Sequence, residues 1–286
     1  MKLQELKILL FIIFPLLYCS CEKTNLDNSI SENSRIDTVE IYSESMNNII
    51  NNIIITPPNY KELKNLPVVY LLHGAYGNYT DWSINVVNLK DFCEEKNIII
   101  VCPDGGFNSW YFDSPIDNQF MYETYITKEL ISHIDSTYPT SKNYLHRAIT
   151  GLSMGGHGAF YLAIRNQDLY VAAGSMSGLF DLRPFSNEWN IADRLGNIND
   201  FPHNWENNSV VNLTDHLLDT DLKLIFDCGS EDVFLEINNL FHEKLVINNI
   251  EHEYIIREGN HNWNYWSLSI FEHLFFFNNI FEYPTL

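Results

Sequence analysis

The segment Gly-Leu-Ser-Met-Gly-Gly at positions 151–156 places a serine between glycines that lie two positions away on either side. An apolar run ending at residue 150 precedes the segment, and the helical pattern of residues 157–165 follows it. G-x-S-x-G between a strand and a helix is typical of a nucleophile elbow, whose sharp turn exposes a strained serine. We predict that Ser153 is a nucleophile; the alternative is a glycine-rich turn with an incidental serine.

A serine hydroxyl becomes a good nucleophile when a base takes its proton and a third group orients that base. His261 lies in a glycine-containing loop just after the last expected strand, where its side chain can reach the serine turn. His242 and His252 precede that strand, and His273 falls inside the C-terminal helical pattern. These three are better explained as surface or packing residues, so His261 is the predicted base.

Three carboxylates, Asp227, Glu231 and Asp232, compete to be the orienting acid after the seventh expected strand. Asp227 still belongs to the end of the strand. Glu231 is one residue away from the position beyond the glycine turn at which the acid is expected. Asp232 lies beyond a glycine turn, with room to fold towards His261. We predict that Asp232 is the acid; the alternative is that it caps the helix that begins near Phe234.

A tetrahedral intermediate of acyl transfer carries an oxyanion that needs two preorganised N–H donors. The residue after an elbow serine supplies one of them, here the amide of Met154. The loop His-Gly-Ala-Tyr-Gly at positions 73–77 follows the third expected strand, and its glycines allow close approach of the backbone. The amide of Ala75 is the predicted second donor, whereas His73 is interpreted as a structural loop residue.

Apolar extended runs alternate with helical patterns over most of the chain. Several runs are continuously apolar, as expected for strands buried on both faces. The expected strands are residues 39–42, 50–56, 67–72, 98–102, 145–150, 171–175, 222–227 and 253–257. The expected helices are residues 85–96, 122–135, 155–165, 236–248 and 263–277. This alternation predicts an α/β fold with a mostly parallel, doubly wound sheet, an antiparallel first pair and helices on both faces. The irregular residues 179–219 are interpreted as a cap over the C-terminal edge of the sheet.

Six motifs in the same order resemble the esterase D family over about residues 38–280. They are PVVYLLHGAYGNYTDW, PDGGFNSWYFDSP, YITKELISHID, GLSMGGHGAFYLA, DCGSEDVF and EGNHNWNYW. That family includes S-formylglutathione hydrolases, tributyrin-type esterases, feruloyl and acetyl-xylan esterases, and mycolyltransferase antigens. The resemblance implies the α/β-hydrolase fold, a triad of Ser153, His261 and Asp232, and an oxyanion hole at Ala75 and Met154. Asn260 stands where many members carry a second glycine.

The expected function is that of a serine carboxylic-ester hydrolase that works through an acyl-enzyme. Feruloyl or acetyl esters of carbohydrate, or short-chain acyl esters, are the expected substrates. An acyltransferase, a thioesterase resembling S-formylglutathione hydrolase and a non-catalytic carbohydrate-binding relative are the alternatives. Trp82, Trp110, Tyr111 and Trp263 fall near the expected site, where they either stack on sugar or phenolic rings or serve as core residues.

Residues 1–20 carry Lys2 and Lys7 ahead of an apolar run that is too short to span a bilayer. They resemble a bacterial lipoprotein signal peptide with Cys21 as the lipidated residue, and Cys19 is the alternative. Residues 21–37 are polar and predict a flexible tether, followed by a catalytic domain at residues 38–286. The expected location is the bacterial cell envelope, with a lipid anchor as the only contact with the membrane.

The chain of 286 residues has a formal net charge of −20 and no cluster of lysine and arginine, which argues against nucleic acid and anionic lipid surfaces as partners. Metal-ligand spacings and phosphate-binding loops are not apparent, so neither a metal nor a cofactor is expected. Cys93, Cys102 and Cys228 are expected to be buried free thiols. The oligomeric state stays open.

Overall fold

The computed structural model describes residues 35–283. The expected signal peptide, residues 1–20, and the lipidation candidates Cys19 and Cys21 lie outside the described residues. Most of the expected tether lies outside them too. Strand β1 begins at Arg35, so residues 35–37 of that tether belong to the sheet instead. Within the described residues, no helix combines the length and the hydropathy needed to cross a membrane.

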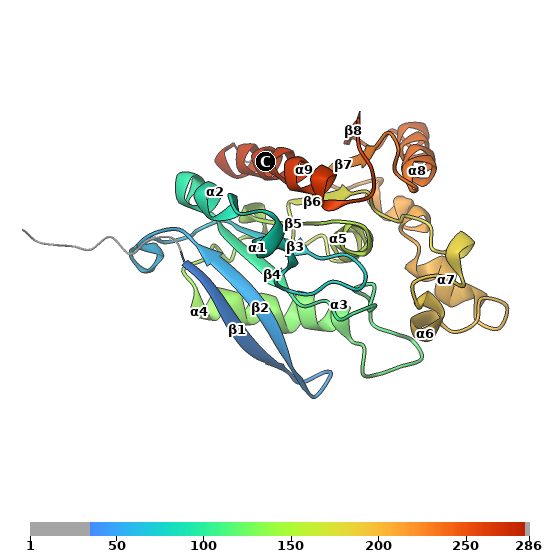
Figure 1. Ribbon diagram of the computed structural model, residues 1–286, viewed down its shortest axis with the longest axis horizontal. Helices are drawn as coiled ribbons and strands as arrows, with labels where there is room; N and C mark the ends of the chain where they lie inside the picture. The colour runs from blue at the N-terminus through green and yellow to red at the C-terminus, as the bar shows by residue number, and fades with distance from the viewer. Residues whose placement is uncertain (1–34, 284–286) are drawn as a thin grey trace, which may run out of the picture. The chain divides into compact units, whose positions relative to one another are not determined.

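The described residues build one sheet of eight strands in the order β1-β2-β4-β3-β5-β6-β7-β8 (Figure 1). The pairs β1/β2 and β2/β4 are antiparallel, and all other neighbours are parallel. The eight expected strands and their antiparallel edge are therefore confirmed. The strands are β1 (Arg35–Ser43), β2 (Asn48–Thr56), β3 (Val68–Leu72), β4 (Ile99–Pro103), β5 (Arg147–Gly151), β6 (Ala172–Met176), β7 (Lys223–Gly229) and β8 (Glu253–Arg257).

Helices connect the parallel strands. They are α1 (Asp81–Asn85), α2 (Leu89–Lys96), α3 (Tyr122–Thr124), α4 (Ile131–Thr137), α5 (Met154–Arg165), α6 (Ile191–Leu195), α7 (Pro202–Asn208), α8 (Leu235–Ile247) and α9 (Trp263–Glu282). A π-helical segment, Tyr125–Leu130, joins α3 to α4. Short 3-10 turns occur at Tyr60–Glu62, Tyr144–His146, Arg183–Phe185, Val210–Asn212 and Thr214–Leu217.

The helix predicted over residues 85–96 exists as α2, but the prediction begins it four residues too early. Helix α1 ends at Asn85 and α2 begins at Leu89. Val86, where α1 is capped, has left the helical region, with φ of −130°. Two consecutive β-branched residues, Val86 and Val87, restrict side-chain rotamers in a helix and favour the break here.

Successive side chains of the strands point alternately into two apolar cores, one on each face of the sheet. Tyr70 and Phe226 belong to the core that α4, α5 and α8 cover. Val69 and Ile225 belong to the core that α1, α2 and α9 cover. Because both of their faces are buried, central strands such as β3 and β4 have the continuously apolar sequences from which they were predicted.

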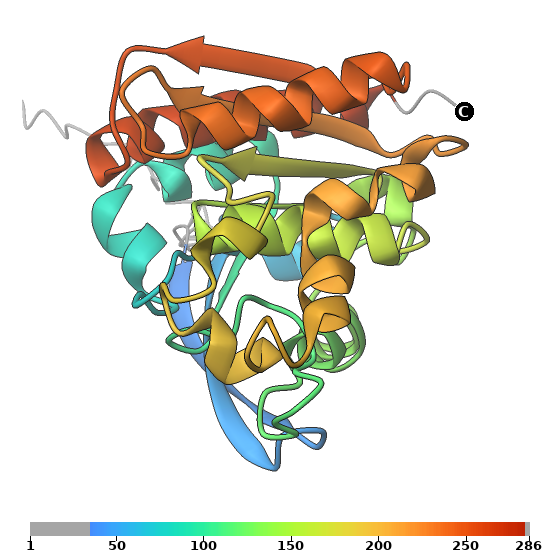
Figure 2. The same cartoon turned by 90° about the vertical axis from the view of Figure 1, so that its right-hand side faces the viewer.

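The chain between β6 and β7 contains α6 and α7 and corresponds to the expected cap. It lies to one side of the sheet in Figure 1 and towards the viewer in Figure 2. Trp205 anchors it, since its ring is fully buried and its Nε1–H donates to the carbonyl of Gly196 at 2.9 Å. We refer to residues 177–222 as the cap.

Candidate active site

Ser153 occupies the turn between the end of β5 and the start of α5. Its backbone has φ of 53° and ψ of −116°, a conformation that is strained for a residue with a side chain. A Cβ atom at Gly151 would lie 2.6 Å from the carbonyl carbon of Gly155, and one at Gly155 would lie 2.5 Å from the carbonyl oxygen of Leu72. Both glycines are therefore required for this turn, as the nucleophile-elbow prediction assumed.

Ser153, His261 and Asp232 form one hydrogen-bonded chain. The Oγ of Ser153 lies 3.0 Å from Nε2 of His261. Nδ1 of His261 lies 3.1 Å and 3.0 Å from the two carboxylate oxygens of Asp232. With Nδ1 protonated, Nε2 is free to accept the serine proton, the arrangement that activates a serine hydroxyl. Asn260 does not disturb it, because its amide instead donates to Glu231 at 3.0 Å.

The other two carboxylates considered as the acid point elsewhere. Asp227 is buried beneath the site and accepts a hydrogen bond from His273 at 2.8 Å. Glu231 contacts Asn260, as described above. Of these three carboxylates, Asp232 is thus the one that contacts His261 in the described part of the chain.

The carboxylate of Asp232 is held in its ionised form. Burial raises the pKa of this carboxyl, but the hydrogen bond and positive charge of His261 and the amide of Phe234 outweigh that effect. The net result is a pKa below the ordinary value. An ionised Asp232 can orient the imidazole and stabilise its protonated form.

The amides of Ala75 and Met154 are available as oxyanion donors. Met154 is the first residue of α5, so its N–H has no partner within the helix. Within residues 35–283, neither amide takes part in another hydrogen bond. The neighbouring loop is fixed, because the amide of Tyr76 donates to the carbonyl of Phe107 at 2.7 Å. Ala75 borders the same cavity as Ser153.

A cavity of about 200 Å³ opens in front of Ser153 and His261. Its walls come from the oxyanion loop, the cap and the start of α9. Four aromatic side chains contribute to them: Tyr76, Trp189, Trp263 and Trp266. Such a small, aromatic cavity fits a compact acyl group or a planar ring better than a long acyl chain.

For Trp82, Trp110 and Tyr111, the structure supports the alternative of core packing over stacking on substrate. All three are almost completely buried, and Nε1–H of Trp82 donates to the carbonyl of Leu72 at 3.0 Å. Of the four aromatic residues named from the sequence, only Trp263 lines the cavity. They are core residues because strand and loop packing fills the space around them.

Sequence reasoning missed Tyr76, Trp189 and Trp266 as cavity residues. Tyr76 lies next to the predicted oxyanion donor, which is a signal that could have found it. Trp189 comes from the irregular cap, whose path the sequence pattern does not define. Trp266 was inside a predicted helix, and its burial against His261 at 4.8 Å between ring centroids depends on how α9 docks.

His73 and the three cysteines of the described residues have structural surroundings. His73 is buried, with Nδ1 at 2.8 Å from the carbonyl of Gly74 and Nε2 accepting from the amide of Gly105 at 2.8 Å. Burial raises the thiol pKa of the three described cysteines, which are free and buried, as predicted: Cys93, Cys102 and Cys228. In the described part of the chain, no three His, Cys, Asp or Glu side chains cluster in a way that could hold a metal ion.

Residues 43–277 match the family model named Esterase, so the chain belongs to the Esterase family. An acetyl esterase of Caldicellulosiruptor saccharolyticus is 26% identical over 216 residues, which are 71% of this chain and 80% of that protein. Esterase MT1326 of Mycobacterium tuberculosis is 33% identical over 135 residues, or 46% of this chain, and the match spans 29% of that longer relative.

A solved structure described as a ferulic acid esterase superposes with a TM-score of 0.73. It is 27% identical, and the match covers 87% of this chain and 99% of that one. The α/β-hydrolase fold and the resemblance to the esterase D and feruloyl esterase group are thereby confirmed.

Proposed function

We propose that this protein is a serine carboxylic-ester hydrolase. The hydrogen-bonded chain from Ser153 through His261 to Asp232 carries the proposal, since it gives a serine, a base and an orienting carboxylate in the required order. The free amides of Ala75 and Met154 beside that serine add the second requirement, a preorganised site for an oxyanion. Membership of the Esterase family supports the same chemistry.

The reaction proceeds by two acyl transfers. Ser153 Oγ attacks the ester carbonyl while its proton passes to Nε2 of His261, and the oxyanion accepts hydrogen bonds from the amides of Ala75 and Met154. The intermediate collapses when His261 returns the proton to the leaving alcohol. Water, deprotonated by His261, then attacks the acyl-enzyme and releases the acid.

The proposed substrates are acetyl or feruloyl esters of carbohydrate, with short-chain acyl esters of similar size. The small cavity supports this choice, because Trp189, Trp263 and Tyr76 border it and leave little room for a long chain. The acetyl esterase and the ferulic acid esterase among its relatives point to the same two acyl groups.

The decisive experiment compares native protein with Ser153→Ala on p-nitrophenyl acetate, p-nitrophenyl butyrate and methyl ferulate. The substitution should lower kcat by at least about a thousandfold, since it removes the covalent nucleophile. Ser136→Ala, on the exposed side of α4, is the matched control and should leave the rates unchanged. Equal rates in native protein and Ser153→Ala would rule out the serine mechanism.

Addition of alcohol acceptors to the same assay tests the alternative of acyl transfer. A hydrolase releases free acid at a rate that the acceptor leaves largely unchanged. Formation of a new ester in place of the acid would identify an acyltransferase that uses the same three residues.

We further propose that residues 1–20 direct export, that Cys21 carries lipid and that residues 22–34 tether the domain to the bacterial cell envelope. The apolar run after Lys2 and Lys7 and the cysteine that follows it support this proposal. Mass spectrometry of the mature N-terminus should find a lipid on Cys21. Loss of that lipid in Cys21→Ser and its retention in Cys19→Ser would separate the two candidates, and an unmodified N-terminus would contradict the proposal.

A further inference from the structure

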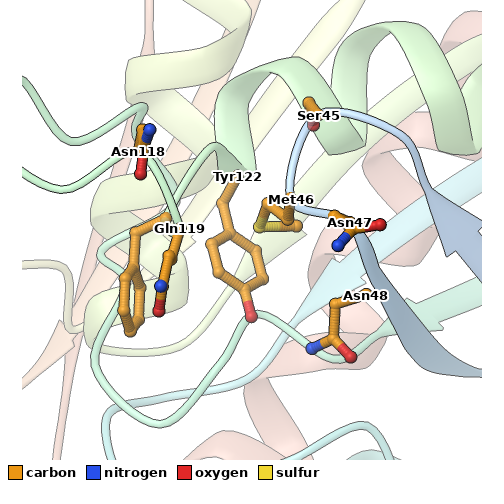
Figure 3. Close-up of a pocket in the computed structure, with 8 residues that line it drawn as sticks. Ser45, Met46, Asn47, Asn48, Asn118, Gln119 and Tyr122 are labelled. Atoms are coloured by element: carbon orange, nitrogen blue, oxygen red, sulfur yellow. The ribbon is translucent and has the colours of Figure 1, made fainter.

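A second cavity, of about 550 Å³, lies between the β1–β2 hairpin and the loop that precedes α3 (Figure 3). Its size falls within the range of small-ligand pockets and exceeds that of the cavity at Ser153. None of the residues that line it is charged. Four of them carry side-chain amides: Asn47, Asn48, Asn118 and Gln119. We call this cavity the hairpin pocket.

Several polar groups of the hairpin pocket are unused by the protein. In Figure 3 the ring of Tyr122 stands between Gln119 on one side and Asn48 on the other. Among the described residues, no hydrogen bond occupies the side-chain amides of Asn118 and Gln119 or the hydroxyl of Tyr122. The amide oxygen of Asn48 accepts from the backbone of Ile49, which leaves its NH₂ group for a ligand.

Both walls of the hairpin pocket are held in place. On the hairpin side, the amide of Ser45 donates to the carboxylate of Glu129 at 2.8 Å. On the loop side, the amide of Gln119 donates to the Asp117 carboxylate at 3.1 Å, and the amide of Ser114 donates to the carbonyl of Phe120 at 2.7 Å. The backbone of both walls is therefore fixed, and binding of a ligand has to order only the exposed amide side chains of Asn118 and Gln119.

The chemistry of the lining selects a neutral ligand rich in hydroxyl groups. A side-chain amide offers donors and an acceptor together, so it can pair with adjacent hydroxyls that each donate and accept. The ring of Tyr122 adds an aromatic surface and a hydroxyl. A phosphate or carboxylate would find no cation among the lining residues, and the net charge of −20 disfavours anions further. Sugar rings meet these requirements.

The hairpin pocket lies beyond the same edge of the sheet as Ser153. Asn52 of β2 pairs with Pro103 at the C-terminal end of β4, so the hairpin extends beyond the edge at which β5 ends in the elbow. Two strands separate β2 from β5, which corresponds to about 14 Å across the sheet, and Asn48 lies four residues, or about 13 Å, beyond Asn52 along β2. One oligosaccharide can span that distance.

The cap connects the two cavities. The guanidinium of Arg194 in α6 pairs with Asp117 of the pocket loop at 2.8 Å, and Ser114 Oγ donates to the carbonyl of Arg194 at 2.6 Å. Trp189, two residues before α6, lines the cavity in front of Ser153. One short segment thus positions part of both sites.

We propose that the hairpin pocket is a second binding site for neutral sugar residues of an esterified glycan, remote from the ester that is cleaved. The contribution of this pocket to ester hydrolysis rests on the proposed esterase function, whereas the binding of sugars to it does not. Sugar residues bound in the hairpin pocket anchor a polymeric substrate, while an ester group on another sugar residue of the same chain enters the cavity at Ser153.

Calorimetric titration of the Ser153→Ala protein with xylohexaose and with cellohexaose tests the binding, because no turnover interferes. At least one probe should bind, and trigalacturonate, which is anionic, should not. The double substitution Asn48→Ala with Gln119→Ala should weaken binding at least about tenfold, since two hydrogen-bonding groups are lost. Tyr122→Phe keeps the aromatic ring and should weaken binding less than the double substitution does. Asn279→Ala, an exposed asparagine on α9, is the control that should bind like the parent protein.

If neither xylohexaose nor cellohexaose binds, or if the double variant binds with unchanged affinity, the hairpin-pocket proposal is overturned. A kinetic measurement separates that failure from failure of the esterase proposal. With Ser153 intact, the double substitution should raise the KM for acetylated xylohexaose. This fold increase should be at least about five times the fold increase in the KM for p-nitrophenyl acetate. Persistent hydrolysis by Ser153→Ala would instead reject the esterase mechanism, whatever the sugar titrations show.

Discussion

Nε2 of His273 donates a 2.8 Å hydrogen bond to the carboxylate of Asp227, and both side chains are completely buried. Nδ1 of the same imidazole lies 2.8 Å from the hydroxyl of Thr150. Thr150 precedes the elbow of Ser153 on β5, and Asp227 lies on β7, which leads to Asp232. This buried contact therefore joins α9 to the two strands that lead to Ser153 and Asp232.

Replacing either member of this pair should destabilise the fold. Asp227→Ala removes the carboxylate partner of the buried His273, which costs about 3–5 kcal/mol for a buried pair. His273→Ala should cost less, because Arg257 and Ser269 still contact the Asp227 carboxylate. The double variant should lose less than the sum of the two single variants, because both remove the same interaction. Urea unfolding measures each value, and strict additivity would show that the two residues are not coupled.

Asp232→Asn should abolish most activity while the protein stays folded. The amide cannot stabilise a protonated His261 and favours the wrong tautomer, so kcat should fall by about 10³–10⁴-fold. Glu231→Gln is the matched control, because Glu231 is adjacent in the chain but contacts Asn260 instead. A larger loss in the control than in Asp232→Asn would show that the acid has been assigned to the wrong residue.

Tyr76 should favour esters of aromatic acids. Its ring is 47% exposed at the cavity and packs against Phe107 with 4.6 Å between centroids. Tyr76→Ala should raise the KM for methyl ferulate about twofold to tenfold, in line with the loss of one aromatic contact. The KM for ethyl acetate, followed by titration of released acid, should change much less. Tyr144→Ala, a half-exposed tyrosine in a 3-10 turn, should alter neither value.

Stability should fall as the pH drops below neutrality because of His157. Burial lowers the pKa of His157 to about 4, and its Nε2–H donates to the carbonyl of Asn208 at 2.8 Å. The unfolded chain takes up a proton near pH 6.5, whereas the folded chain resists until about pH 4. The stabilising contribution is therefore complete above pH 6.5 and is lost as the pH falls towards 4, by about 3 kcal/mol.

Denaturant unfolding between pH 7.5 and 4 measures this effect. The variant His157→Gln can still donate to Asn208 but does not titrate, so its stability should change less over the same range. A steeper loss of stability in that variant would contradict the assignment. The lowered pKa of Asp232 acts at lower pH, because its contribution disappears only when that carboxylate itself becomes protonated.

Local sequence was sufficient for the elements whose signals are local. Continuous apolar runs marked central strands such as β3 and β4, because strands covered on both faces have no polar side to show. The glycines around Ser153 marked the elbow, because only a residue without a side chain fits beside the backbone of Leu72. The positions of Asp232 and His261 in glycine-containing turns after expected strands then pointed to the acid and the base.

The tertiary structure decided which of these residues face substrate. Trp110 and Tyr76 are both aromatic residues of loops near the site, yet the first is 1% exposed and the second 47%. That difference depends on how the cap and the loops pack, and no local pattern encodes it. The hairpin pocket has the same origin, since Asn48 and Gln119 are far apart in the chain and meet only because the sheet brings a hairpin beside a distant loop. The sequence by itself determined the residue types available for catalysis and the succession of strands and helices along the chain. Long-range packing determined the walls of both cavities.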